Sequence, residues 1–216
     1  MRALRGVIFD FDGTLADSLG LFYAMACDVL AAAGAPPAPR ATVYALMGAA
    51  EPDLVRKLFP PSFPDLETVL KRVWGERRHV WLRRYQEETQ PVPGALPLLH
   101  ALHARGLSLG IATSSGRELR SLDRWGVRGL FGSIVGRESV RMRKPHPEPV
   151  LRCAEELALP TAALAYVGDS PVDVRAGRAA GAFTVGVLGG TSPREVLHAE
   201  SPDAILESVA ELERLL

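Results

Sequence analysis

The chain has 216 residues, which suits one medium domain or a core domain that carries a smaller insert. Hydrophobic residues make up 47% of it, so a sizeable core can be buried. Its 25 basic and 25 acidic residues balance, which argues against nucleic acid or an anionic membrane as a partner, since such proteins normally carry a basic excess. The first residues lack the long apolar stretch of a signal peptide, and no run approaches a membrane span, so we expect a cytoplasmic location.

The first part of the chain combines one strand with a long helical stretch. Val7-Ile8-Phe9 is a short apolar run, typical of a buried strand. Residues 18–88 follow a largely helical pattern that is interrupted by prolines. We expect a first helix that ends near Gly34, weaker helices at 42–47 and 53–58, and a longer helix at 65–88. Asp17 and Ser18 are interpreted as capping residues of the first of these helices.

After residues 91–94 the pattern becomes regular. The sequence predicts helices at 95–105, 117–125, 148–157 and 172–180, strands at 107–112, 133–135, 164–167 and 183–187, and a last helix at the end. Apolar strands that alternate with helices indicate a parallel sheet covered on both faces. We therefore predict a doubly wound α/β core made of residues 1–16 and 92–216, with residues 17–91 as a helical insertion.

Polar residues follow several of the predicted strands. Asp10 and Asp12 follow the first strand, Thr113 the second and Asp169 the fourth. Lys144 lies in the loop after the third strand. Because ligands bind at the carboxyl ends of the strands in an open parallel sheet, we expect these groups to meet at one edge.

These residue types suit phosphoryl transfer. Of the two carboxylates at Asp10 and Asp12, one can attack phosphorus while the other handles the proton of the leaving group. Asp169 and Asp173 are four residues apart at a helix start, so they lie on one face and can hold a hard cation such as Mg²⁺. Thr113 begins a segment that can receive phosphate oxygens, and Lys144 supplies positive charge.

The motifs resemble those of the haloacid dehalogenase superfamily of phosphohydrolases. Asp10-Phe11-Asp12-Gly13-Thr14-Leu15 is similar to its first motif and Thr113 to its second. Lys144-Pro145 is similar to the third, and Gly168-Asp169 through Asp173 to the fourth. The four motifs occur in order, and the helical insertion resembles the small cap domain of the family.

The resemblance implies a role for each of these residues. Asp10 would be the nucleophile that becomes a phospho-aspartate, and Asp12 the general acid and then the general base. The family's Mg²⁺ would be bound by Asp10, the backbone carbonyl of Asp12 and Asp169, with Asp173 acting directly or through water. The transferring phosphoryl group would be held by Thr113, Ser114 and Lys144.

The cap carries the information on the substrate. Residues 32–39 with Met47-Gly48, and the run Lys144-Pro145-His146-Pro147, are similar to phosphoglycolate phosphatases, which assigns Gly48 to substrate binding. Ala49-Ala50 and Glu51 depart from that pattern, and Glu51 would repel an anionic substrate. We therefore expect a small phosphorylated metabolite, with phosphoglycolate, sugar phosphates and pyrophosphate open, and a monomer or homodimer.

Three other enzyme classes and one non-enzymatic class remain as alternatives. Dehalogenases and phosphonate-cleaving relatives lack the equivalent of Asp12, so its presence disfavours both. Sugar-phosphate mutases keep both aspartates but carry a cap histidine where this chain has Phe22. A phosphate-binding module without activity predicts the loss of a motif residue. A hydrolase is therefore favoured.

Overall fold

A computed structural model describes residues 4–47 and 55–216. Its strands are β1 (Gly6–Phe9), β2 (Ala16–Asp17), β3 (Gln90–Pro91), β4 (Ser108–Ala112), β5 (Phe131–Val135), β6 (Leu164–Gly168), β7 (Phe183–Val187) and β8 (Ala204–Leu206). Its α-helices are α1 (Leu19–Ala32), α2 (Arg40–Met47), α3 (Leu66–Glu88), α4 (Ala95–Ala104), α5 (Arg120–Arg124), α6 (Glu148–Glu156), α7 (Pro171–Ala180), α8 (Arg194–Ala199) and α9 (Leu212–Leu215).

Six strands form one parallel sheet in the order β5-β4-β1-β6-β7-β8. The central strand β1 is buried on both faces, because Val7 and Phe9 join one hydrophobic cluster while Ile8 joins the other. The first cluster includes leucines of α4 and α9, and the second includes residues of α6 and α7. This confirms the predicted doubly wound α/β core.

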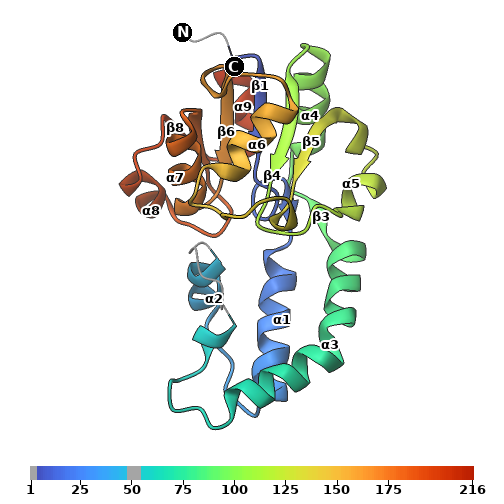
Figure 1. The fold of residues 1–216 in the computed structure, drawn as a ribbon, viewed down its shortest axis with the longest axis vertical. Coiled ribbons are helices and arrows are strands. Elements are labelled where there is room, and N and C mark those ends of the chain that lie inside the picture. The colour runs from blue at the N-terminus through green and yellow to red at the C-terminus, as the bar shows by residue number, and fades with distance from the viewer. Residues whose placement is uncertain (1–3, 48–54) are drawn as a thin grey trace.

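Helices α1, α2 and α3 lie beyond the carboxyl ends of the sheet strands, below the sheet in Figure 1. They share a small core of their own that includes Val29, Leu30, Phe59, Val73 and Trp81. The insertion begins and ends at β2 and β3, which pair in antiparallel fashion. The predicted domain boundaries at residues 17 and 91 fall on this two-stranded ribbon.

Some elements differ from the sequence prediction. The helix expected at 117–125 is shortened to α5, and the expected 53–58 helix is a 3₁₀ turn at Arg56–Leu58 within the described part. Strand β8 and helix α8 were not predicted. Strand β8 has only three residues, and all of them are half-buried. The sequence therefore shows no alternation of apolar and polar residues that would predict a strand there. In the described residues, no helix is both long and apolar enough to cross a membrane.

Candidate active site

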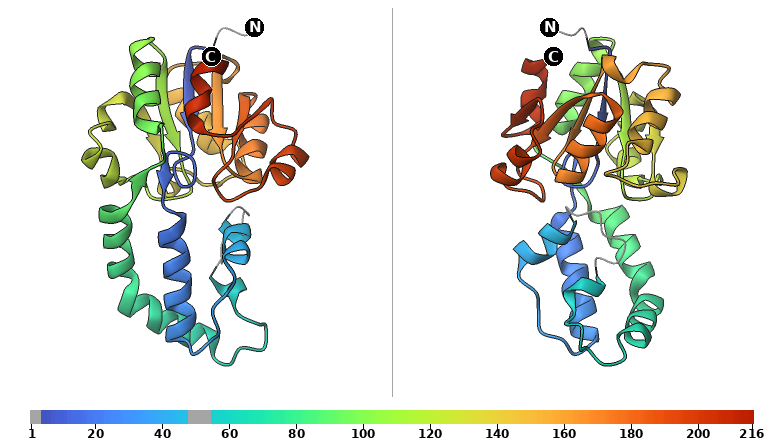
Figure 2. Two further views of the ribbon diagram at one scale, coloured as in Figure 1. Left: turned by 180° about the vertical axis from the view of Figure 1, so that it is seen from behind. Right: turned by 60° about the vertical axis from the view of Figure 1, so that its left-hand side comes forward.

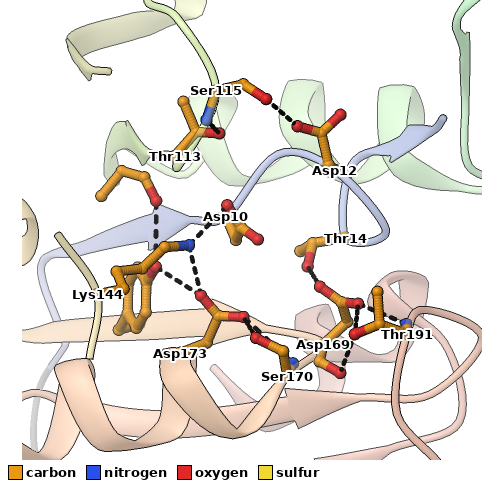
Figure 3. Close-up of polar contacts among 12 residues, drawn as sticks. Asp10, Asp12, Thr14, Thr113, Ser115, Lys144, Asp169, Ser170, Asp173 and Thr191 are labelled. Atoms are coloured by element: carbon orange, nitrogen blue, oxygen red, sulfur yellow. Dashed lines mark hydrogen bonds and ion pairs between the residues drawn. The ribbon is translucent and has the colours of Figure 1, made fainter. Parts of the chain in front are cut away.

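Six of the predicted site residues converge at the carboxyl edge of the sheet, as Figure 3 shows: Asp10, Asp12, Thr113, Lys144, Asp169 and Asp173. Asp10 directly follows β1, Thr113 follows β4, and Asp169 follows β6, while Lys144 comes from the loop between β5 and α6. Since β1 pairs with both β4 and β6, these three strand ends are immediate neighbours. The topology therefore brings together residues that lie up to 159 positions apart (169 minus 10).

A buried lysine links two of the carboxylates. Lys144 Nζ lies 2.8 Å from Asp10 Oδ1 and 2.6 Å from Asp173 Oδ1, and the lysine is only 5% exposed. Burial by itself lowers the pKa of Lys144, but Asp10 and Asp173 outweigh that effect and hold this pKa well above its ordinary value. The lysine is therefore a permanent positive charge beside Asp10.

Both carboxylate oxygens of Asp173 accept hydrogen bonds. Oδ1 accepts from Lys144 and from the Tyr166 hydroxyl at 3.0 Å, and Oδ2 accepts from the backbone N–H and the hydroxyl of Ser170. The Ser170 contacts form a capping box at the start of α7, which fixes the carboxylate at the helix N-terminus. Asp173 thus orients Lys144 as well as facing the carboxylate cluster.

Asp169 is held by two loops. Its Oδ2 accepts from the backbone N–H of Thr191 at 2.6 Å and from the Thr191 hydroxyl at 2.8 Å, and Oδ1 accepts from the Thr14 hydroxyl at 3.2 Å. Gly13 has φ +81°, and a Cβ there would lie 2.6 Å from Asp169 Oδ2. The missing side chain at Gly13 is therefore what lets the first loop approach Asp169.

The carboxylates of Asp10, Asp169 and Asp173 form a candidate cation site. Ligand oxygens of the three lie within 4.8 Å of one another, and all three residues are buried. Burial, followed by the charge of Asp173, raises the pKa of Asp169 to about 6. Carboxylate oxygens are the ligands that Mg²⁺ prefers, and three carboxylates beside one lysine leave a negative excess. The residues therefore fit a divalent cation.

Asp12 faces away from this cluster and is surrounded by hydroxyl donors. Ser18 and Tyr85 donate to its Oδ1 at 2.6 and 2.9 Å, and Ser115 donates to its Oδ2 at 2.5 Å. Burial raises the pKa of Asp12, and the three hydrogen bonds limit that rise. A raised pKa suits a carboxyl group that must carry a proton during part of a reaction.

The loop after β4 supplies the other predicted residues. Thr113 is buried, and its hydroxyl accepts from the backbone N–H of Ser115 at 3.0 Å. Ser114 is exposed at the edge of the sheet. Gly48, which the sequence assigned to substrate binding, lies outside the described residues, as do Ala49, Ala50 and Glu51.

Sequence reasoning missed several residues that contact the aspartates: Thr14, Tyr85, Ser115, Tyr166, Ser170 and Thr191. Their hydroxyl groups are common in any chain, and only the fold brings them to a carboxylate. The capping interpretation of Ser18 was wrong: its side chain makes no cap hydrogen bond at α1 and instead donates to Asp12. The sequence signal for this contact was the position of Asp12, six residues before Ser18.

Comparisons with known proteins agree with this geometry. The sequence profile of the haloacid dehalogenase-like hydrolases matches residues 7–187. Phosphoglycolate phosphatase of Salmonella typhi is 31% identical over 235 residues, covering 98% of this chain and 92% of its own length. The Yersinia pestis enzyme of the same name is 32% identical over 216 residues, with the same coverage of 98% and 92%.

Solved structures show the same fold. A predicted phosphoglycolate phosphatase from Haemophilus somnus superposes with a TM-score of 0.85 at 24% identity, covering 100% of this chain and 99% of its own. A Thermotoga maritima protein named as a candidate beta-phosphoglucomutase has a TM-score of 0.73 at 26% identity, covering 99% and 100%. Because the family profile spans more than half of the residues, the chain belongs to the haloacid dehalogenase-like hydrolases, and it is a phosphatase of the phosphoglycolate phosphatase-like type.

Proposed function

We propose that this phosphatase hydrolyses small phosphate monoesters in a Mg²⁺-dependent reaction, through a phospho-aspartate formed on Asp10. Phosphoglycolate and sugar phosphates are the candidate substrates, the former because curated relatives at 31% and 32% identity carry the name phosphoglycolate phosphatase. The observation that carries the proposal is Asp10 at 2.8 Å from a buried lysine, beside Asp169 and with Asp12 two residues on.

The metal would be held by Asp10, the backbone carbonyl of Asp12 and Asp169, with Asp173 next to them. When bound, Mg²⁺ supplies positive charge that offsets the carboxylates and the phosphate oxygens. Lys144 contributes a second positive charge beside Asp10, so that an anionic phosphate and an anionic nucleophile can approach each other. Thr113 and Ser114 would hold the phosphoryl oxygens.

In the first step, a carboxylate oxygen of Asp10 forms a bond to phosphorus while the bond from phosphorus to the leaving oxygen breaks. Asp12 gives its proton to that oxygen, and the alcohol departs. In the second step, Asp12 takes a proton from water, whose oxygen bonds to phosphorus. The bond between phosphorus and Asp10 then breaks, which releases inorganic phosphate and restores both aspartates.

Helices α1–α3 are proposed to act as a cap, with the β2–β3 ribbon as the hinge and residues 17–91 as the moving unit. A cap that closes over the site excludes water and strengthens the electrostatic interactions inside it. Such a small cap suits metabolites. The predicted monomer or homodimer and the cytoplasmic location stay predictions.

The test is phosphate release from phosphoglycolate, sugar phosphates, ethyl phosphate and pyrophosphate, with and without Mg²⁺. We expect metal-dependent release that falls by at least about 10³-fold in Asp10→Asn, because the covalent route is lost. Glu155→Gln is the matched control, because Glu155 is an exposed carboxylate on α6, outside the hinge. When the reaction with a phosphorus-32-labelled phosphate ester is quenched rapidly, the labelled phosphoryl group should stay covalently bound to the native protein but not to the Asp10→Asn variant. Comparable turnover by a pure Asp10→Asn sample would contradict the nucleophile assignment.

A phosphate mutase is the second candidate, because a structural neighbour at 26% identity is named for that activity. The position of Phe22 on α1 disfavours it, since a phenyl ring cannot exchange a proton with a sugar hydroxyl. Phosphoryl exchange between sugar phosphates without net phosphate release would favour the mutase instead.

A further inference from the structure

The hydroxyl group of Tyr166 lies deep inside the protein. Tyr166 is the middle residue of β6 and only 1% exposed, and its side chain belongs to the hydrophobic cluster that α6 and α7 form with the sheet. These two helices lie in front of the sheet in Figure 1, whereas α4 and α9 lie in front of it in the view from behind, left in Figure 2. A phenylalanine would fill this place without burying a hydroxyl, which costs free energy unless it is hydrogen-bonded. The partners of the hydroxyl therefore matter.

Two oxygen atoms lie within hydrogen-bond distance of this hydroxyl. Tyr166 Oη is 3.0 Å from Asp173 Oδ1 and 3.1 Å from the carbonyl oxygen of Ala112, the last residue of β4. A tyrosine hydroxyl carries one hydrogen, so it donates to one of the two at a time. Hydrogen bonds to an ionised acceptor are about twice as strong as those between neutral groups. This favours the Asp173 carboxylate, which is ion-paired with Lys144, over the Ala112 carbonyl.

The ring of Tyr166 and the Asp173 carboxylate are both held in place. A Cβ on Gly177 of α7 would lie 2.8 Å from Tyr166 Cδ1, which shows how closely this helix packs on the ring. Asp173 lies in the first turn of the same helix, and its Oδ2 accepts from the backbone N–H and the hydroxyl of Ser170. Packing therefore fixes the ring, and the capping box fixes the second oxygen of the carboxylate.

The position of Lys144 depends on this pair. Lys144 Nζ donates to Asp173 Oδ1 at 2.6 Å, the same oxygen that Tyr166 contacts, and lies 5.9 Å from the centroid of the Tyr166 ring. Figure 3 shows the ammonium group between Asp173 and Asp10, its second partner. Asp10 gives up its carboxylate charge when it bonds to phosphorus in the proposed reaction, whereas Asp173 keeps its charge throughout. Asp173 is therefore the permanent anchor of a side chain that has many rotamers.

We propose that Tyr166 is a positioning residue for phosphoryl transfer, which acts on Lys144 through Asp173. Its hydroxyl holds Asp173 Oδ1 where that oxygen fixes Lys144 beside Asp10. The inference rests on the proposed function, in which Lys144 lets an anionic phosphate approach an anionic nucleophile. Without the hydroxyl, Asp173 Oδ1 has one donor fewer and Lys144 is less restrained. Misplacement of a catalytic group by about 1 Å can cost about 100-fold in rate.

The test is a double-mutant cycle on the hydrolysis of 4-nitrophenyl phosphate at saturating Mg²⁺. We expect Tyr166→Phe to lower kcat about tenfold in the native background, but by less than about twofold when Asp173→Ala is already present. Tyr23→Phe is the matched control and should leave kcat unchanged. It also removes a hydroxyl that donates to a backbone carbonyl, but that of Ala38 within the insertion.

Losses that simply multiply in the double variant would overturn the inference, because the hydroxyl would then act through the Ala112 carbonyl or through packing. If circular dichroism shows that Asp173→Ala is unfolded, Lys144→Ala takes its place in the cycle, and independent losses again overturn the inference. No hydrolysis of any ester by the native protein would overturn the proposed function as well.

A second measurement separates Lys144 from the cation site. Thermal unfolding with and without MgCl₂ should give the same increase in Tm for Tyr166→Phe as for the native protein, because the hydroxyl acts on the lysine. A Tm increase that disappears in Tyr166→Phe would show that Tyr166 acts on the cation site, and would overturn the inference even if kcat falls as expected.

Discussion

At the scale of single residues, the surroundings of Asp12 differ from those of Asp10. Asp10 shares a cluster with Lys144, Asp169 and Asp173, whereas the Asp12 carboxylate accepts hydrogen bonds from hydroxyl groups. Two aspartates separated by one residue thus have different chemical environments, which suits one nucleophile and one proton carrier. One of the donors, Tyr85, comes from the insertion, so the position of the insertion and the orientation of Asp12 are linked.

This link predicts a selective effect of Tyr85→Phe. The change removes one hydrogen bond to Asp12, worth about 1 kcal/mol, so we expect kcat for ethyl phosphate to fall about fivefold. Turnover of 4-nitrophenyl phosphate should fall much less, since 4-nitrophenolate leaves without a proton. Tyr23→Phe is the control, because Tyr23 donates to the Ala38 carbonyl within the insertion and not to Asp12. Equal losses for both esters would contradict a selective role of Tyr85 in protonating the leaving group through Asp12.

Of the two cysteines, Cys153 is buried and Cys27 is half-buried. Burial raises the pKa of Cys153 to about 12, so the folded protein keeps this thiol neutral well above the pKa of an unfolded thiol. The stability contributed by the neutral thiol is therefore present below about pH 9 and lost as the pH rises toward 12.

We accordingly predict that a thiol reagent at pH 8 labels one cysteine per native chain, and both after denaturation. Cys27→Ser should reduce native labelling to near zero. Rapid labelling of Cys153 in the native Cys27→Ser variant at pH 8 would show that the core around β4 and α6 opens readily.

At the scale of elements, two glycines in helix interiors lead to opposite predictions. A Cβ on Gly75 of α3 would meet no atom within 4 Å, so Gly75→Ala should stabilise the fold by about 0.5–1 kcal/mol through helix propensity. A Cβ on Gly177 of α7 would lie 2.8 Å from both Thr184 Cγ2 and Tyr166 Cδ1. Gly177→Ala should therefore destabilise the fold by about 1–3 kcal/mol through overpacking.

Urea denaturation of both variants would measure these changes. Tyr166 also donates to Asp173, so Gly177→Ala should impair turnover as well, whereas Gly75→Ala should not. A destabilised Gly75→Ala variant would show that the bend of α3 seen in Figure 1 depends on this glycine.

The core elements could be predicted because their patterns are strong. Buried parallel strands are continuous apolar runs, and prolines and glycines separate them from the helices. Elements that depend on partners were missed: β2 and β3 have two residues each, and neither exists without the other. Their pairing is long-range in the chain and leaves no local periodicity.

The residues of the site also fall into those that the sequence could predict and those that it could not. The aspartates and Lys144 could be predicted because each follows a strand, begins a predicted helix or lies in a predicted loop of the core. The hydroxyl donors could not, since Tyr85 and Thr191 reach their aspartates only after the insertion and the β7–α8 loop have taken their places. The helical pattern of residues 65–88 also did not reveal that Trp74 on α3 is 40% exposed.

At the scale of the whole molecule, the carboxylate cluster joins loops after β1, β6 and β7 and the start of α7. Ionised carboxylates in one buried cluster repel each other, and Lys144 offsets only one negative charge. A divalent cation bound there should therefore stabilise the folded chain as a whole. At a hundred times its dissociation constant, Mg²⁺ should add about 2.7 kcal/mol and raise Tm by roughly 5–10 °C.

Thermal unfolding with increasing MgCl₂, at constant ionic strength, would measure this shift. We expect Asp169→Asn to abolish it, because the variant removes one carboxylate charge from the cluster. Thr191→Val should keep part of the shift but need more Mg²⁺, since it removes only the hydroxyl bond and leaves the backbone N–H bond to Asp169 in place. Asp17→Asn should shift like the native chain, because Asp17 is exposed and outside the cluster. An equal Mg²⁺ response in Asp169→Asn would show that the cation binds elsewhere, whatever its effect on turnover.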